Sequence, residues 1–215
     1  MPPLPAYAMP SPPGPAEARV GWQVDPARAL VLVHDMQKYF IDAFPAGRQP
    51  VTTLVANIGR LLAAAAEAGV PVAYTAQPGG MDRVQRGLLH DFWGPGMSAD
   101  PQHRRIVEAL APQSSDTVLT KWRYSAFHRT GLAELMSAQG RDQLIICGVY
   151  AHIGCLVTAC DAFSLDIQPF LVADAVADFS AEDHLLALNY AVRRCAAVPD
   201  TESVVVALSS VATAT

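Results

Sequence analysis

Short apolar runs alternate along the chain with longer stretches in which apolar residues recur at helical spacing. The short runs are rich in β-branched and aromatic residues and are bounded by polar or turn residues, as buried strands are. They cover Ala29 to Val33, Val72 to Thr75, Thr117 to Thr120, Leu144 to Cys147 and Phe170 to Val172, and a sixth strand is expected near Ala196 to Val198. The alternation predicts an α/β fold, in which a doubly wound, mainly parallel six-stranded sheet carries helices on both faces.

The helical stretches lie between these runs. Val51 to Ala68 is rich in alanine and leucine, and Gly69, which follows it, is a residue that commonly ends helices. Val204 to Leu208 fits a strand and a helix equally well, and its state is left open. Further crossover helices are expected over Thr130 to Gln139, Gly154 to Leu165 and Ala181 to Arg194.

The N-terminal segment differs in composition from the rest of the chain. Residues 1–20 are rich in proline and have neither a basic start nor a continuous apolar stretch, so they do not resemble a secretory signal. The chain has 215 residues, of which 51% are apolar, which is enough for one sizeable core. Residues 21–215 are therefore expected to form a single domain. No apolar run approaches the roughly 18 residues that cross a bilayer, so no membrane span and a cytoplasmic location are expected.

Charge and cysteine content restrict the partners. The 15 basic and 20 acidic side chains give a formal charge of −5 with no basic run, which argues against nucleic acid as a partner. The four cysteines form no CxxC pair and are expected to be small buried apolar residues. His34, His128 and His152 lack the spacing of a metal site, so neither a metal nor another cofactor is expected.

Chemically active residues follow the strands, at the edge where ligands bind in open α/β sheets. Asp35 comes directly after the first run, where burial would raise the pKa of its carboxyl group and make proton donation possible. A helix N-cap is the alternative role for this residue. Lys121 ends the third run, where a solvent-exposed lysine would be ordinary. The presence of both residues at the same sheet edge favours an active site.

Several longer blocks of sequence resemble the isochorismatase family. They are VLVHDMQKYF, YTAQP, RGLLHDFWGPGM, TKWRYSAFHRT and GVYAHIGCLVTACDAFSLDIQPFLVADAVADFS, and the resemblance extends from Ala6 to about Asp200. It implies a Rossmann-like three-layer sandwich, a homodimer, and a cofactor-free hydrolase acting on an ether bond. The implied substrate is a small dicarboxylate derived from chorismate: isochorismate or 2-amino-2-deoxyisochorismate, as used in siderophore or phenazine biosynthesis. The block RGLLHDFWGPGM slightly favours the amino substrate.

The chain departs from the wider superfamily at one position. Many of those proteins are cysteine hydrolases with a nucleophilic cysteine where this chain has Gly154. Cys155 lies one residue further, about 100° around a helix, and is expected to point away from the site. The expected reaction is therefore hydrolysis of the enolpyruvyl (vinyl) ether to pyruvate and a dihydro-hydroxy-benzoate or anthranilate, without a covalent intermediate. A cysteine amidohydrolase that uses Cys155, and a non-catalytic scaffold, are the alternatives.

The resemblance also implies the roles of individual residues. Asp35 would donate the proton and Lys121 would be its catalytic partner. The peptide bond between Val149 and Tyr150 would be cis. Substrate would contact Gln77, Arg86, Trp93, Tyr124, Tyr150 and Gly154. Judged without the resemblance, the arginine fits a solvated side chain and the aromatic residues fit a core.

Overall fold

A computed structural model describes residues 2–210, so that Met1 of the expected arm and residues 211–215 of the expected domain lie outside the described residues. The sheet is entirely parallel, with the strand order β3-β2-β1-β4-β5. Its strands are β1 (Ala29–His34), β2 (Val72–Ala76), β3 (Thr117–Thr120), β4 (Gln143–Val149) and β5 (Gln168–Ala177). The predicted fold class is confirmed, and the predicted strands lie within these limits.

The prediction of a sixth strand is wrong for the described part of the chain. Ala197 forms one isolated parallel bridge with Phe170, beside the edge strand β5. Pro199 has no N–H to continue the ladder, and Asp200 directly begins α9 (Thr201–Ser209) by accepting a hydrogen bond from the backbone N–H of Ser203. Helix α9 contains Val204 to Leu208, the segment whose state the sequence left open, and this segment is therefore helical.

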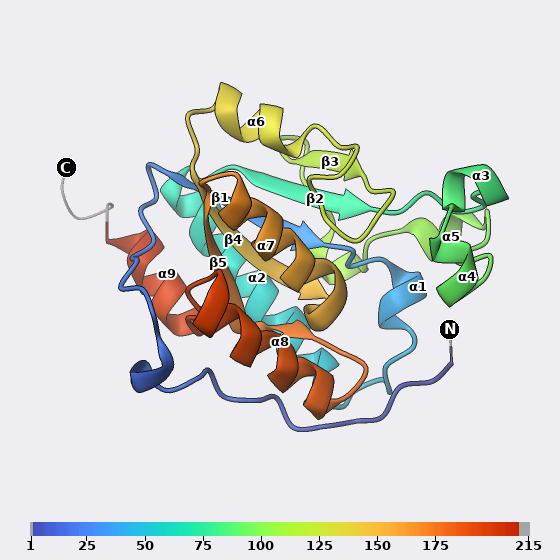
Figure 1. The fold of residues 1–215 in the computed structure, drawn as a ribbon, viewed down its shortest axis with the longest axis horizontal. Coiled ribbons are helices and arrows are strands. Elements are labelled where there is room, and N and C mark those ends of the chain that lie inside the picture. Colours follow the sequence, from blue (N-terminus) through green and yellow to red (C-terminus); the bar gives the residue numbers. More distant parts are fainter. Residues whose placement is uncertain (1, 211–215) are drawn as a thin grey trace.

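Helices cover both faces of the sheet (Figure 1). On one face, Val31 and Val33 of β1 belong to the same apolar cluster as residues of α2 (Val51–Ala68) and α9. On the other face, Leu30 and Leu32 pack with α6 (Leu132–Ala138), α7 (Leu156–Ser164) and α8 (Ala181–Arg194). This alternation along β1 is the period-two pattern of a strand buried on both sides.

Helix α2 is long and apolar enough to cross a membrane, judged by its length and composition alone. In the fold, however, Leu54, Ile58 and Leu61 of this helix are fully buried in the core. The apolar composition of α2 is therefore accounted for by its packing on the sheet.

Short helices gather beyond the carboxyl ends of the strands (Figure 1). They are α1 (Lys38–Ile41), α3 (Arg83–Arg86), α4 (Leu89–Trp93) and α5 (Pro101–Arg104). Elsewhere in the chain, 3-10 turns cover Pro15–Glu17 and Glu108–Leu110. Asp82 and Gln85 form a capping box that begins α3, because each side chain accepts a hydrogen bond from the other residue's backbone N–H. These helices surround the edge of the sheet where Asp35 and Lys121 lie.

The N-terminal arm lies against the body of the protein. The backbone N–H of Leu4 donates to the carbonyl oxygen of Ala43 (2.8 Å), and that of Met9 donates to Oε1 of Gln49 (3.0 Å). The hydroxyl of Tyr7 accepts a hydrogen bond from the backbone N–H of Asp178 (2.7 Å). The described arm thus extends to the helices at the carboxyl edge of the sheet (Figure 1).

Candidate active site

A cavity of about 700 Å³ opens at the carboxyl ends of the central strands. Every site residue expected from the sequence lines it: Asp35, Gln77, Arg86, Trp93, Lys121, Tyr124, Tyr150 and Gly154. The structure therefore brings together residues that are spread over more than half of the chain. The parallel strand order explains this for the residues that follow strands, because the ends of β1, β2, β3 and β4 lie next to one another, whereas Arg86 and Trp93 come from the short helices α3 and α4.

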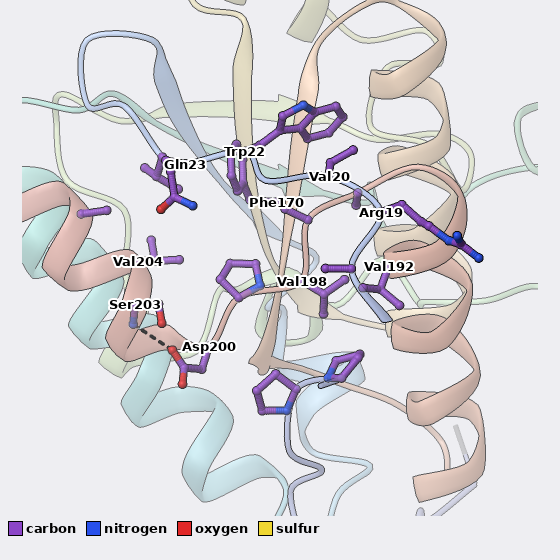
Figure 2. Close-up of a pocket in the computed structure, with 18 of the residues that line it drawn as sticks. Arg19, Val20, Trp22, Gln23, Phe170, Val192, Val198, Asp200, Ser203 and Val204 are labelled. Atoms are coloured by element: carbon purple, nitrogen blue, oxygen red, sulfur yellow. Dashed lines mark hydrogen bonds between the residues drawn. The ribbon is translucent and has the colours of Figure 1, made fainter. Parts of the chain in front are cut away.

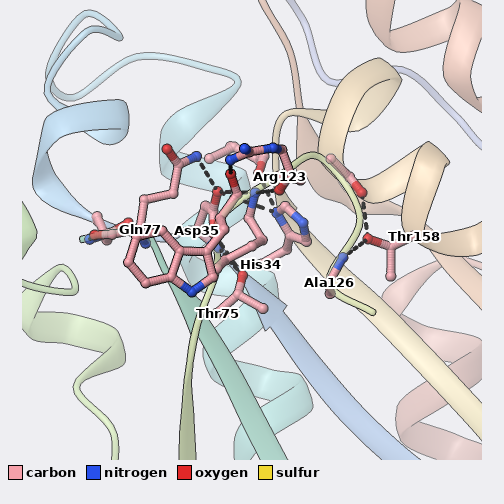
Figure 3. A network of polar contacts seen from close by, with 12 residues as sticks. His34, Asp35, Thr75, Gln77, Arg123, Ala126 and Thr158 are labelled. Carbon is pink, nitrogen blue, oxygen red and sulfur yellow. Dashed lines mark hydrogen bonds and ion pairs between the residues drawn. The ribbon is translucent and has the colours of Figure 1, made fainter. Parts of the chain in front are cut away.

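Asp35 is held by polar groups on both carboxylate oxygens (Figure 3). Oδ1 accepts a hydrogen bond from the hydroxyl of Thr75 (2.7 Å), and Oδ2 accepts one from Nε2 of Gln77 (2.9 Å). Nζ of Lys121 lies 2.9 Å from the same Oδ2. The residue has a φ of +49°, a backbone conformation that non-glycine residues adopt mainly where packing enforces it. It does not cap a helix, since the N-cap of α1 is Gln37.

Opposing influences set the charge state of Asp35. Burial by itself raises the pKa of this carboxyl group, as expected. Lys121, His34 and the hydrogen bonds from Gln77 and Thr75 act in the opposite direction, and together they lower the pKa of Asp35 below its ordinary value. Asp35 is therefore an ionised carboxylate in the free protein, and it could donate a proton only after a change that raises this pKa.

Lys121 is a buried side chain and not a surface lysine. It is only 2% exposed, and Nζ also donates a hydrogen bond to the carbonyl oxygen of Arg123 (2.7 Å). A buried ion pair repays the desolvation of its two charges only with good geometry and further hydrogen bonds. Both conditions hold here, because Asp35 and Lys121 each have additional polar partners.

Arg86 is buried and forms no ion pair within residues 2–210, which makes it a candidate binding group for an anion. Its Nε donates to the carbonyl oxygen of Gly94 (3.0 Å), and burial lowers the pKa of the guanidinium. Gly96 packs so closely on the guanidinium that a Cβ added to it would overlap Cζ of Arg86. Arg86 therefore lies within the cavity wall and is not a solvated side chain.

Aromatic side chains form much of the remaining wall. Nε1 of Trp93 donates to the hydroxyl of Tyr124 (2.7 Å), and the ring of Trp93 lies 5.9 Å from that of Phe179. Phe179 also packs on Tyr150, with 4.4 Å between the ring centroids. The Tyr150 hydroxyl donates to the carbonyl oxygen of Phe40 (3.1 Å), and the predicted cis peptide before Tyr150 is confirmed. These rings form an apolar surface beside the buried charges.

Gly154 lines the cavity and Cys155 does not. Residues Ala151–Cys155 form a π-helical turn before α7, so the regular helix begins at Leu156 and not at Gly154 as predicted. Cys155 is completely buried in the apolar cluster beneath α7 and α8, and burial raises the pKa of its thiol well above the ordinary value. The expected orientation of Cys155, away from the cavity, is confirmed.

Sequence reasoning missed several residues of the cavity wall, among them Pro2, Leu4, His34, Arg123 and Phe179. His34 and Arg123 are close to Asp35 and Lys121 in sequence, so their position at the strand ends was a usable signal. Thr75, which hydrogen-bonds Asp35, ends a predicted strand and gave the same signal. No local pattern marks Pro2 and Leu4, since the arm reaches the cavity only through tertiary contacts.

Two other regions of residues 2–210 offer a group of ligand-type atoms and a second cavity. His152, Asp178 and Asp183 place ligand-type atoms within 4.8 Å of one another. Asp178, however, already accepts hydrogen bonds from the backbone of His152 (2.6 Å) and of Phe179 (2.8 Å), and its bond with the imidazole raises the pKa of His152. A second cavity of about 380 Å³ lies between the arm, β5 and α9 (Figure 2). Its wall is mainly apolar, and Asp200 there serves as the cap of α9.

Comparisons with known proteins agree with this geometry. Residues 29–203 match the family model described as Isochorismatase domain. The chain is 58% identical over 184 residues to the phenazine biosynthesis protein PhzD of Pseudomonas fluorescens, covering 86% of this chain and 88% of that protein. It is 55% identical over 203 residues to an isochorismatase of Bacillus subtilis, covering 94% of this chain and 65% of that protein's length. The solved structure of a cysteine hydrolase from Pseudomonas syringae is similar, with a TM-score of 0.80 and 28% identity, over 89% of this chain and 97% of that one.

Proposed function

Because this chain belongs to the isochorismatase family, we propose that it hydrolyses the enolpyruvyl ether of isochorismate or of 2-amino-2-deoxyisochorismate and releases pyruvate. One observation carries the proposal. A buried carboxylate, Asp35, lies beside a buried ammonium in a cavity where the neighbouring helix start presents Gly154 in place of a nucleophilic side chain. Such a site can move a proton and admit water, which is what hydrolysis of a vinyl ether needs.

The reaction proceeds through an oxocarbenium ion. The carboxylic acid of Asp35 gives its proton to the terminal methylene of the enolpyruvyl group, and the C=C electron pair forms the new C–H bond. The resulting carboxylate then faces the cation, an electrostatic stabilisation that arises only as charge develops. Water adds to the cationic carbon and loses a proton, and the hemiketal collapses to pyruvate and the ring alcohol.

Substrate binding supplies the protonated state of Asp35. In the free protein, Lys121 is the largest of the influences that lower the pKa of this carboxyl group. A dicarboxylate bound beside Lys121 and Arg86 compensates their positive charge and raises the pKa of Asp35 again. The general acid is thus competent mainly in the complex.

The cavity wall suits the two halves of such a substrate. Arg86 offers a planar guanidinium for a carboxylate, since its terminal nitrogens have no anion to bind in the described part of the chain. Trp93, Tyr124 and Tyr150 enclose the cyclohexadiene ring and exclude water from it. Gln77 holds the carboxylate of Asp35 in position.

The substituent on the ring is tested by direct comparison of substrates. Isochorismate and 2-amino-2-deoxyisochorismate are supplied separately, and pyruvate release is followed with a coupled reductase. We expect a larger kcat/KM for the amino compound, in line with the block RGLLHDFWGPGM and with the similarity to a phenazine biosynthesis protein. A larger value for isochorismate reverses this assignment, and no pyruvate from either substrate contradicts the proposed function.

The alternatives find less support. A cysteine amidohydrolase would need Cys155 as its nucleophile, but this thiol is buried outside the cavity. Full activity after treatment with a thiol alkylating reagent is the expected result. A scaffold without activity would not need Asp35 and Lys121 to be paired inside a cavity.

We propose the oligomeric state, the cellular location and the partners from membership of the family. We expect a cytoplasmic homodimer that acts on a small dicarboxylate and binds neither nucleic acid nor membranes. Sedimentation velocity tests the dimer directly, since the chain mass is 22.9 kDa.

A further inference from the structure

His34 is the last residue of β1 and is completely buried between Asp35 and the loop that follows β4. Its Nδ1 lies 2.8 Å from the carbonyl oxygen of Val149 and 3.9 Å from Oδ2 of Asp35. Burial lowers the pKa of the imidazole to about 4, so the ring is neutral at neutral pH. The hydrogen on Nδ1 therefore donates to Val149, and the orientation of the ring is fixed.

Gly154 packs directly on the other side of this ring. A Cβ added to Gly154 would overlap Cε1 of His34 and would lie 2.8 Å from Nε2 and 3.0 Å from Nδ1. The separations to Cε1 and Nε2 are shorter than real Cβ atoms show in folded proteins, so any side chain at position 154 would require the buried ring to shift. A second glycine, Gly148, packs on the backbone of His34 and not on the ring, since its Cβ would overlap the carbonyl oxygen of His34.

We propose that His34 is a positioning residue that determines the reaction type: its imidazole occupies the volume that any side chain at position 154 would need. The part of the cavity that faces Asp35 and Lys121 is thereby kept free for substrate and water, and no nucleophilic side chain can be accommodated beside them. The steric part of this proposal stands on the geometry alone. Its consequence for water rests on the proposed function.

A matched set of variants separates this role from ordinary core packing. In His34→Asn, the side-chain amide can still donate a hydrogen bond to Val149, but the atoms that face Gly154 are removed. Gly154→Ala adds one methyl group against the intact ring. The double variant adds the same methyl group where the ring is absent. His34→Val, which suits the end of a strand, replaces His34→Asn if the asparagine variant does not fold.

Thermal unfolding gives the first readout and needs no substrate. We expect Gly154→Ala to lower Tm markedly in the original background and to change it little in the His34→Asn background. Equal losses of Tm in the two backgrounds would show that the residues are not coupled and would overturn the proposal. Activity gives a second readout, because displaced catalytic groups should make the specificity constant of Gly154→Ala fall by about 100-fold or more.

Thiol chemistry tests whether position 154 opens into the cavity once the ring is gone. The double variant His34→Asn with Gly154→Cys is treated with iodoacetamide in the folded state, and the peptides are analysed by mass spectrometry. We expect alkylation of the introduced thiol and little alkylation of the buried Cys147 and Cys155. An introduced thiol that stays unmodified would contradict the proposal, whereas failure of the parent chain to release pyruvate would contradict only the proposed function.

Discussion

Nζ of Lys121 lies 2.9 Å from Oδ2 of Asp35, and both side chains are almost completely buried. The two residues directly follow β1 and β3, which are separated in the sheet by β2. Thr75 lies on β2, and its hydroxyl donates to the other oxygen of the same carboxylate. These contacts keep Asp35 ionised, and it must become protonated before it can act as the proposed acid.

Asp35→Asn removes the proposed proton donor and keeps the shape of the side chain. We expect pyruvate release to fall by about 10² to 10⁴-fold, because this is the usual contribution of a general acid. Substrate affinity should change little, since Arg86 and the aromatic wall are unaltered. Single-turnover pyruvate release at saturating substrate is the measurement, and a rate within a few-fold of the parent enzyme would remove Asp35 from the mechanism.

Lys121→Met removes the ammonium that lowers the pKa of Asp35. The pKa of this carboxyl group should then rise, so the pH range over which Asp35 becomes protonated moves upward. The pH dependence of kcat/KM should move in the same direction, with a lower maximal rate. Lys38→Met is the matched control, because Lys38 lies on the exposed side of α1. A pH profile unchanged in Lys121→Met would contradict the assigned coupling.

Arg86→Gln removes the buried positive charge proposed to bind a carboxylate. A hydrogen bond to a charged group contributes about 1.5 to 3 kcal/mol, so KM should rise by about 10- to 100-fold with a smaller effect on kcat. Arg83→Gln serves as control, since Arg83 lies on the same short helix but is exposed. Steady-state kinetics that show equal effects for the two substitutions would place the carboxylate site elsewhere.

Cys155→Ala should leave most of the activity intact. The thiol is outside the cavity, and the substitution creates a small void costing about 1 kcal/mol of stability. Urea unfolding measures the stability and kcat/KM measures the function. A folded alanine variant without activity would instead favour the amidohydrolase chemistry.

Stability should depend on pH through His34. Because burial lowers the pKa of this imidazole from 6.5 to about 4, the unfolded chain binds the proton first as the pH falls. The neutral imidazole of His34 contributes fully to the free energy of unfolding above the pKa of the unfolded chain. This contribution is lost progressively between about pH 6.5 and 4, by about 3 kcal/mol in total. Urea unfolding at a series of pH values should show a shallower decline in His34→Asn. Parallel curves for the two proteins would contradict the depressed pKa.

The sequence predicts much of the fold because the central strands carry their own signal. The limits of β3, α2 and α8 agree with the prediction, since each element is bounded by turn or capping residues. Strand β5 is longer than its apolar run, because Asp174 interrupts the pattern. That carboxylate is satisfied by Asn57 and Thr201, which are distant in sequence and could not be paired in advance.

The candidate active site also contains residues that the sequence identifies and residues whose position depends on distant contacts. Residues directly after strands, such as Asp35 and Lys121, could be assigned because parallel strands end at one edge. The burial of Arg86 depends on its packing against Gly96, and the position of Leu4 depends on contacts of the arm with the body. Such relationships join segments without a shared local pattern, so only the folded structure reveals them.

The course of the arm has a practical consequence for protein production. Pro2 and Leu4 belong to the cavity wall, so an affinity tag fused to the N-terminus would be attached within a few residues of the proposed active site. Helix α9 lies at the opposite side of the molecule from the α3 to α5 rim (Figure 1). A purification handle placed after α9 is therefore attached away from this cavity, and kinetic constants from the two tagging schemes should differ in KM.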